Sequence, residues 1–340
     1  MTRPLMRVAV VGAGQASAPH LLALNELRDQ VALAWVVART PQRLAALALP
    51  PGTRPTTELQ DVLQDRSVEA ALVLTPPNSH LDIAQQLAQA GKHVLVEKPL
   101  DTTLPRAQAL VQACEHHGVK LAVMLQHRMR AASQALARLV ADGTLGSLTG
   151  ASASIRWWRP QSYYDEPGRG TLARDGGGVL MTQAIHTLDL LMSLTGLPAQ
   201  VTALTATSPV HQMECEDTVT AMLRYPNGAL GSIDATTAAW PGFNERIALN
   251  CTLGSATLEA GELTVNMHDG STTRVGEKQA TGSGANLMAF DHGPHRAVLE
   301  DFVSAIRARR EPAVSGRSAL AVHRLIDAMV ASQGRPVSLV

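Results

Sequence analysis

The first 125 residues alternate short apolar runs with amphipathic segments. The apolar runs lack polar alternation, which is typical of parallel strands buried on both faces; they span residues 8–11, 31–37, 70–74, 94–96 and 121–124. Between them lie helical patterns at 19–27, 41–47, 81–90 and 105–116, the last two each followed by a glycine. Strands that alternate with helices predict a doubly wound parallel sheet.

The second half of the chain differs, because its apolar and polar residues alternate in segments that follow one another directly. Helices are expected over 133–141, 178–194, 295–309 and 319–332. Strands are expected over 148–158, 201–207, 218–225, 230–237, 246–252 and 256–259, with a hairpin turn at Pro226-Asn227-Gly228. This order predicts a mostly antiparallel sheet, open on one face and backed by helices on the other.

The two different patterns of apolar and polar residues predict an α/β chain of two domains. A length of 340 residues also favours two domains. The first domain is expected over residues 1–125. The second, an α/β domain with the open-faced sheet, is expected over 126–340, with its C-terminal helices at 295–333 closing the chain. The loop 279–284 is expected to be mobile.

Composition excludes several classes of protein. The net charge is zero and no block of Lys and Arg occurs, so no electrostatic footprint for nucleic acid is visible. Three cysteines without metal-ligand or C-x-x-C spacing fit a reducing compartment and predict no metal site. The first strand starts near Arg7, and no apolar stretch reaches membrane length. A soluble cytoplasmic protein without a membrane or nucleic-acid partner is expected.

A glycine loop follows the first strand and precedes the first helix. Its residues are Gly12, Ala13, Gly14, Gln15, Ala16 and Ser17. Gly12 permits the tight turn, and Gly14 lets the backbone approach a pyrophosphate at the helix N-terminus. Ser17 replaces the usual third glycine and is small enough for close helix packing. The context predicts dinucleotide binding; an ordinary strand–helix turn is the alternative.

The end of the second strand bears on the choice of cofactor. An acidic residue there receives the ribose 2′-hydroxyl of NAD, whereas an Arg accommodates the 2′-phosphate of NADP. This chain has Ala38, then Arg39 and Thr40, with Arg43 one helical turn later. Arginine grips phosphate in bidentate fashion, so NADP is favoured over NAD. The alternative is that Thr40 caps the next helix and the arginines are solvated.

Two further motifs carry reactive side chains. Lys98 lies between a strand end and Pro99, where an ammonium group can stabilise developing alkoxide charge. Three glycines at 176–178 precede a helix on which Thr182, His186 and Asp189 share one face. The glycines are expected to leave the N-terminal amides of that helix accessible. The alternatives are a surface lysine and a histidine of the core.

These motifs together resemble the glucose–fructose oxidoreductase/inositol dehydrogenase/MocA family, and the likeness covers nearly the whole chain. It rests on the glycine loop, Thr75-Pro76-Pro77-Asn78-Ser79-His80, Glu97-Lys98-Pro99, the stretch 176–190 and the tail motifs Glu300-Asp301-Phe302 and Gly334-Arg335-Pro336-Val337. The resemblance implies a Rossmann domain, a second domain whose sheet forms a homodimer or homotetramer, and NAD(P)-dependent redox chemistry on sugars, sugar acids, cyclitols or related alcohols. It makes Lys98 and His186 the catalytic pair.

The resemblance also extends the cofactor site beyond the glycine loop and the second strand end. The further residues expected there are Thr75, Pro76, Asn78, His80, Glu97, Lys98 and Gln126.

One departure from the family pattern affects the chemistry. Members commonly have Asp four residues before the histidine, and this chain has Thr182. A hydroxyl orients a substrate but is no general base near neutral pH, so proton transfer falls on His186. Two other functions therefore stay open: a NAD-dependent glycosidase that uses transient oxidation, and a non-catalytic dinucleotide-binding regulator.

The segment before the three glycines at 176–178 bears on the choice of substrate. Four of the ten aromatic residues, Trp157, Trp158, Tyr163 and Tyr164, fall within eight positions and are interleaved with arginines. Aromatic faces pack on sugar rings, and Arg grips carboxylate or phosphate, which suits a sugar acid or a nucleotide-linked sugar. The alternative is that the aromatics pack a sheet or an interface and that nearby acids neutralise the arginines. The residues expected to contact substrate are Thr182, Gln183, Arg128, Arg159 and Tyr163.

Overall fold

The computed structural model describes residues 4–14, 16–278 and 291–339. Gln15 and the loop expected to be mobile at 279–284 lie outside these residues. The chain divides into two compact units: the first comprises residues 1–126 and 292–320, and the second comprises 127–291 and 321–340. The segment 292–320, which we expected in the second domain, therefore belongs to the first unit.

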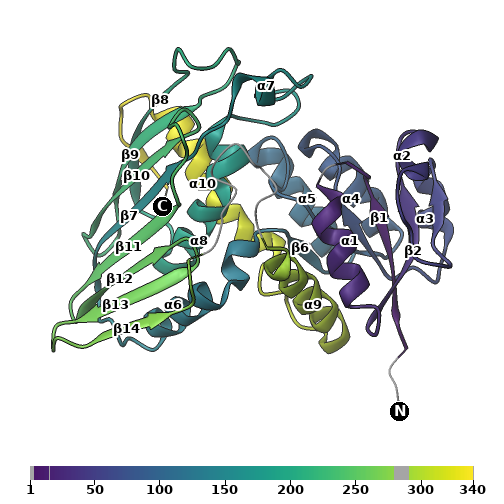
Figure 1. The fold of residues 1–340 in the computed structure, drawn as a ribbon, viewed down its shortest axis with the longest axis horizontal. Helices are drawn as coiled ribbons and strands as arrows, with labels where there is room; N and C mark the ends of the chain where they lie inside the picture. The colour runs from purple at the N-terminus through teal and green to yellow at the C-terminus, as the bar shows by residue number, and fades with distance from the viewer. Residues whose placement is uncertain (1–3, 15, 279–290, 340) are drawn as a thin grey trace. The chain divides into compact units, whose positions relative to one another are not determined.

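A six-stranded parallel sheet forms the centre of the first unit (Figure 1). Its order is β3-β2-β1-β4-β5-β6, the doubly wound arrangement in which the strand order reverses beside β1. The strands are β1 (Met6–Val11), β2 (Val31–Val37), β3 (Arg54–Thr56), β4 (Ala70–Val73), β5 (His93–Val96) and β6 (Leu121–Val123). β4 is buried throughout, which confirms the reading of its apolar run as a strand covered on both faces.

Helices connect these strands and cover the sheet. They are α1 (Ser17–Glu26), α2 (Pro41–Ala45), α3 (Leu59–Gln64), α4 (His80–Gln89) and α5 (Leu104–His116), with a short turn η1 (Pro77–Ser79). α9 (Gly293–Ala308) contacts both α1 and β5. Its apolar face, with Phe302 fully buried, explains why this late segment joins the first unit.

The second unit is built on a nine-stranded sheet of order β14-β13-β12-β11-β7-β10-β9-β8-β15. Every neighbouring pair is antiparallel except β7 and β10, which run parallel. The strands are β7 (Leu148–Arg156), β8 (Gln200–Ala206), β9 (Thr218–Arg224), β10 (Leu230–Thr236), β11 (Arg246–Cys251), β12 (Gly254–Glu259), β13 (Glu262–Met267), β14 (Thr272–Val275) and β15 (Val337–Ser338).

One face of this sheet is covered and the other is open, as expected. α6 (Ala131–Ala141) and α8 (Ile185–Thr195) contact the covered face, as Figure 1 shows. Burial alternates along β9, where Val219, Ala221 and Leu223 are buried and Met222 is exposed. The remaining helical elements are η2 (Gln126–Met129), α7 (Gln161–Tyr164), the π-helical turn η3 (Leu180–Ala184) and α10 (Gly316–Ser332).

Several elements were not expected from the sequence. β3 contains a proline and is largely exposed, and β14 is mostly exposed at the sheet edge, so neither has an apolar run to reveal it. β13 does alternate buried and less buried positions, with Leu263 and Val265 inward, so its signal was present in the sequence.

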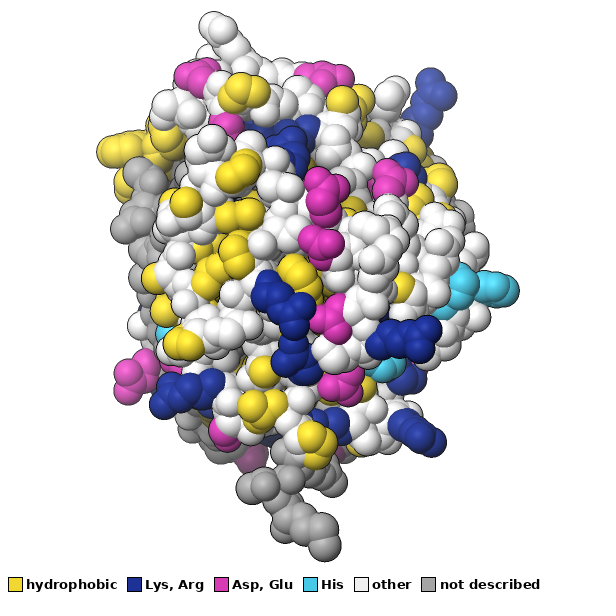
Figure 2. All heavy atoms as spheres, turned by 90° about the vertical axis from the view of Figure 1, so that its right-hand side faces the viewer, with side chains coloured by type: hydrophobic (Ala, Val, Ile, Leu, Met, Phe, Trp, Pro, Cys, Tyr) yellow, Lys and Arg dark blue, Asp and Glu magenta, His cyan; other side chains and the backbone are white. Residues whose placement is uncertain are grey.

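In the part of the chain that the structure describes, no helix is long and apolar enough to span a bilayer. Figure 2 shows acidic and basic side chains mixed on the face turned to the viewer, without a continuous field of either sign.

Candidate functional site

The candidate cofactor residues of the first unit gather at one edge of its sheet. All six strands are parallel, so their carboxyl ends meet at the same edge. The glycine loop follows β1, Ala38 follows β2, Thr75 lies just beyond β4, and Glu97 follows β5. Ligands of open α/β sheets bind at this edge, next to the reversal of strand order.

The two glycines of the loop are required for different reasons. Gly12 has φ +109°, and a Cβ there would lie 2.8 Å from the carbonyl carbon and oxygen of Leu74. Among the described residues, only Arg43 Nη1 would lie within reach of a Cβ on Gly14, at 4.0 Å. The protein itself therefore demands glycine at 12, whereas the open space at Gly14 leaves room for a ligand. Ser17 is buried and donates its hydroxyl to the Gly14 carbonyl at 2.7 Å, which holds the loop against α1.

The β2 end has the groups expected around a 2′-phosphate. Ala38 is buried and offers no carboxylate, while Arg39, Thr40 and Arg43 are exposed. Thr40 occupies the N-cap position of α2, but its side chain makes no capping hydrogen bond. Among the described residues, neither arginine pairs with a carboxylate, and Arg43 reaches toward Gly14.

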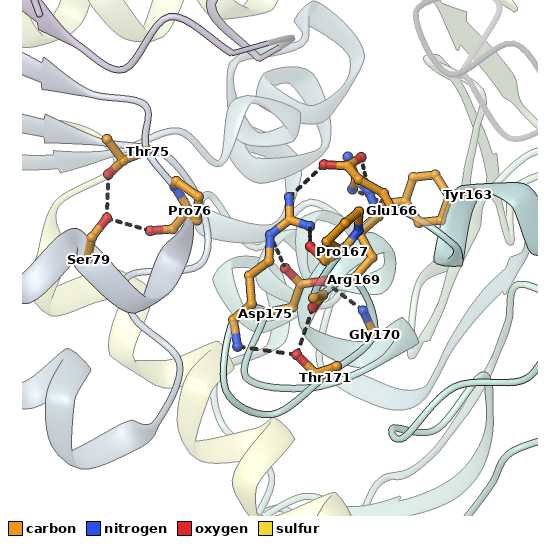
Figure 3. A network of polar contacts seen from close by, with 12 residues as sticks. Thr75, Pro76, Ser79, Tyr163, Glu166, Pro167, Arg169, Gly170, Thr171 and Asp175 are labelled. Carbon is orange, nitrogen blue, oxygen red and sulfur yellow. Dashed lines mark hydrogen bonds and ion pairs between the residues drawn. The ribbon is translucent and has the colours of Figure 1, made fainter. Parts of the chain in front are cut away.

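The loop after β4 is held by its own polar contacts, seen at the left of Figure 3. Ser79 Oγ lies 2.8 Å from both Thr75 Oγ1 and the Pro76 carbonyl. The His80 ring nitrogens lie 2.8 Å and 3.0 Å from the carbonyls of Thr75 and Pro99. Burial lowers the pKa of His80, and its side chain has no exposed surface. His80 therefore joins the loops that follow β4 and β5, and the cofactor contact expected for it stays a prediction.

Lys98, after β5, and Gln126, after β6, place polar groups at the same edge of the sheet. Glu97 accepts a hydrogen bond from the Lys98 backbone N–H at 3.0 Å, and Lys98 is half-buried. Gln126 Oε1 is buried and has no hydrogen-bond partner in the described structure. A buried acceptor without a donor is costly, so a ligand donor such as a carboxamide would satisfy it. The edge fits a dinucleotide at both its phosphate-binding and its amide-binding end.

In the second unit, the three glycines at 176–178 precede a helix whose N-terminal amides we expected to be accessible. The structure shows these amides occupied. The Gly178 and Leu180 N–H groups donate to the Glu216 carboxylate at 3.1–3.2 Å, and the Val179 N–H donates to its backbone carbonyl at 2.8 Å. The expectation was wrong because a carboxylate distant in sequence caps this helix end, where the helix dipole favours negative charge.

Beyond the cap, polar side chains form a chain of contacts around Tyr163. The Tyr163 hydroxyl accepts from Arg169 Nη1 at 2.7 Å, and both residues are labelled in Figure 3. It also accepts from Gln183 Nε2 at 3.3 Å. Gln183 Oε1 in turn contacts the Thr182 hydroxyl, which also donates to the Gly178 carbonyl at 2.7 Å. The structure thus brings together three of the residues expected to contact substrate.

The helix α8 carries His186 and Asp189. His186 is 8% exposed, and its ring stacks on His127 with centroids 5.0 Å apart. Asp189 is fully buried and accepts from two guanidinium nitrogens of Arg128, one of them at 2.7 Å. These two Arg128 nitrogens are engaged by a carboxylate of its own unit, which leaves less of this side chain for a substrate than expected.

The segment 156–174, which is rich in aromatic residues and arginines, has a partly structural role. Some of its arginines pair with a nearby acid and some of its aromatics are buried, as the alternative interpretation expected. Glu166 lies within ion-pair distance of Arg169 and Arg174, at 2.7 Å and 2.9 Å. Tyr164 is buried, with its hydroxyl 2.7 Å from Thr237 Oγ1. Arg159 is also buried, and its guanidinium lies 5.0 Å from the Trp157 ring and 5.8 Å from that of Tyr163.

Two residues near the site were missed from the sequence. Glu216 caps the helix from a loop next to Asp217, and no local pattern marks an acid that binds amides 36 to 38 positions away. His127 directly precedes Arg128, which we expected to contact substrate. Its stacking on His186 could not be foreseen, because the two residues are far apart in sequence.

Comparison with known proteins supports this description. A family model described as "Oxidoreductase family, NAD-binding Rossmann fold" matches residues 6–125, and one described as "GFO/IDH/MocA C-terminal domain" matches 133–257. Two uncharacterized oxidoreductases of Schizosaccharomyces pombe, C115.03 and C26H5.09c, are 29% and 28% identical over 66% and 65% of this chain. The matches span only 61% and 60% of those two proteins.

Other relatives align over nearly their whole length. D-apiose dehydrogenase of Paraburkholderia graminis is 28% identical over 97% of this chain and 89% of its own. The WlbA dehydrogenase of Bordetella pertussis, solved with NADH and UDP-GlcNAcA, is 29% identical, with a TM-score of 0.84 over 98% of this chain and 99% of its own. With both domain models matched in order, the chain belongs to the Gfo/Idh/MocA family of oxidoreductases.

Proposed function

We propose that this protein is an NAD(P)-dependent dehydrogenase that acts on a CH–OH group of a sugar, sugar acid, cyclitol or related small molecule. The observation that carries the proposal is the sheet edge of the first unit. The open space at Gly14 follows β1 there, Lys98 follows β5, and the unsatisfied Gln126 Oε1 follows β6. The three free, buried cysteines suit a reducing compartment such as the cytoplasm.

The chemistry divides between the cofactor and two side chains. A nicotinamide cofactor held by the glycine loop and the strand-end residues would supply or accept the hydride. In oxidation, His186 accepts the hydroxyl proton of the substrate, and the Lys98 ammonium stabilises the alkoxide. In reduction, His186 returns that proton. Thr182 orients the substrate without exchanging a proton.

The substrate class is best tested with nucleotide-linked sugar acids first, because the WlbA relative was solved with UDP-GlcNAcA. Polyols, free sugars and glycosides complete the panel, with reduced nicotinamide followed by absorbance. Turnover of the cofactor with one of these classes supports the proposal. Cleavage of a glycoside with no net change in the cofactor would favour the glycosidase. Dinucleotide binding without turnover of any class would favour the regulator.

NADP(H) is expected to bind more tightly than NAD(H). The carboxylate that would repel a 2′-phosphate is absent at Ala38, and Arg39 and Arg43 supply cationic donors. Arg39→Ala should weaken NADP binding by about 1.5–3 kcal/mol, as for a hydrogen bond to a charged group, and leave NAD binding unchanged. Calorimetry measures both affinities. Arg28→Ala, beyond the opposite end of α1, is the matched control and should change neither. Equal losses for both cofactors in Arg39→Ala would refute the preference.

The open face of the second unit's sheet is proposed to join copies of this chain into a homodimer or homotetramer. Leu204, Met222 and Leu230 are each more than 60% exposed, and the strand register places all three on that face. Such a group of exposed apolar side chains is typical of an interface. Met222→Glu should shift light-scattering mass toward the monomer, whereas Leu172→Glu, exposed but outside the sheet, should not. A monomeric wild type would contradict the proposal.

A further inference from the structure

Two histidines and a glutamate form a compact cluster in the first unit. His20 Nε2 lies 2.6 Å from Glu97 Oε1, and one ligand atom of each of His20, Glu97 and His295 lies within 4.8 Å of the others. The rings of His20 and His295 meet edge to face, with centroids 5.5 Å apart. Both histidines are buried, and the Glu97 side chain is 14% exposed.

Both carboxylate oxygens of Glu97 are engaged as acceptors. Hydrogen bonding and charge from His20, with further charge from His295 and Lys98, outweigh desolvation and lower the pKa of Glu97 to about 2. Glu97 is therefore ionised at neutral pH and carries no proton, so the proton of the 2.6 Å contact must lie on His20 Nε2. The other oxygen, Oε2, accepts the Lys98 backbone N–H.

A metal ion is the other chemistry open to such a set, since two histidines and a carboxylate are common ligands. Bonds of ~2.0–2.2 Å in a tetrahedral site would hold ligand atoms roughly 3.3–3.6 Å apart. The contact between His20 and Glu97 is shorter than that and has the length of a charge-assisted hydrogen bond. The geometry favours a proton between these two groups.

The cluster joins three segments that are distant in sequence. His20 lies in α1, the helix that begins at the glycine loop; Glu97 directly follows β5; and His295 lies in the first turn of α9. α9 is fixed to α1 a second time, because Glu26 lies 2.8 Å from His292 and 3.3 Å from Arg296. Glu97 is thus contacted from α1 and α9 while its other oxygen accepts the Lys98 backbone N–H.

We propose that His20, Glu97 and His295 are positioning residues that fix the turn carrying Lys98 to the dinucleotide-binding helix. The cluster aims the Lys98 ammonium through hydrogen bonds rather than by touching substrate. This role rests on the proposed function for its catalytic consequence, but the restraint on the Lys98 backbone is a property of the protein alone.

The test compares His20→Leu with His20→Gln. Leucine removes the donor, whereas the glutamine amide reaches about as far as Nε2 and restores it. Hydrogen exchange of the peptide spanning Lys98, followed by mass spectrometry, should be at least ~10-fold faster in His20→Leu, as expected for a lost hydrogen bond to a charged group. It should return to near the wild-type rate in His20→Gln. With an active substrate, kcat should fall and recover in parallel, and the substrate KM should change little.

Leu24→Ala is the control for general weakening of α1, since Leu24 is buried on the same helix and is not part of the cluster. It should lower the melting temperature without accelerating exchange at Lys98. Unchanged exchange in His20→Leu, or no recovery in His20→Gln, would overturn the proposal. A stoichiometric metal found by elemental analysis of the purified protein would overturn it as well. The exchange result stands even if no substrate is turned over, so failure of the positioning role and failure of the proposed function are distinguishable.

Discussion

His186→Ala should lower kcat by at least ~100-fold, the loss typical of a missing general acid–base group. Thr182 is no general base near neutral pH, so no hydroxyl at that position can replace the imidazole. Thr182→Val should cost only about 0.5–1.5 kcal/mol, because the Thr182 hydroxyl makes neutral hydrogen bonds to Gly178 and Gln183. Steady-state kinetics with the substrate identified above measures both effects.

His127→Phe is the matched control for His186, because it keeps an aromatic ring against the imidazole while removing the ring nitrogens of His127. It should retain most of the activity if His127 serves only to stack. Full activity in His186→Ala would end the proposed mechanism. Conversely, a wild type that turns over nothing, with activity appearing in Thr182→Asp, would favour the regulator.

Gly178→Ala is expected to destabilise the protein by more than about 3 kcal/mol, which combines overpacking with the loss of several hydrogen bonds to the half-buried Glu216 carboxylate. A Cβ at this position would lie 1.7 Å from the Glu216 carbonyl oxygen and 2.7 Å from its carbonyl carbon. Neither atom belongs to a flexible side chain, so the backbone at Glu216 must move. Its hydrogen bonds to the helix N-terminus would be lost with it, and urea unfolding should show the change.

Gly177→Ala provides the comparison from the neighbouring residue. Its Cβ would lie 2.7 Å from Met181 Cγ and 3.2 Å from Met181 Cβ, so a side chain and not the distant backbone has to move. We expect a loss of about 1–3 kcal/mol there, the usual cost of overpacking, and therefore a smaller loss than at residue 178. Similar losses for the two variants would show that the Glu216 contact does not restrict residue 178.

The strands and helices around the sheets were largely predictable, because burial leaves a periodic pattern. The run at 70–74 is apolar because β4 is covered on both faces, and the alternation along 218–225 reflects one covered and one open face. β3 was missed because an exposed edge strand with a proline needs no apolar residues. The placement of α9 in the first unit was missed because an amphipathic helix does not reveal which sheet it covers.

Residues of the candidate site could be predicted where they belong to a local motif. They could not be predicted where their contact partners are distant in sequence. The glycine loop and Glu97-Lys98-Pro99 each follow a strand directly, so order along the chain is enough to find them. The Glu216 cap and the His20–Glu97 contact each join positions at least 36 apart, and no spacing rule connects them. The π-helical turn at Leu180–Ala184, which directly precedes the helix that carries His186, also leaves no mark in an apolar pattern.

The different surroundings of Gly12 and Gly14 bear on how such loops change during evolution. Gly12 faces the backbone of Leu74 and Thr75, so selection for a folded sheet alone would retain it. Gly14 has open space at its Cβ position, so only selection for a bound ligand would retain glycine there. A descendant of this protein that had ceased to bind a dinucleotide should therefore keep the first glycine and drift at the second. Retention of the second glycine, and not of the first, therefore indicates that the loop still binds a dinucleotide.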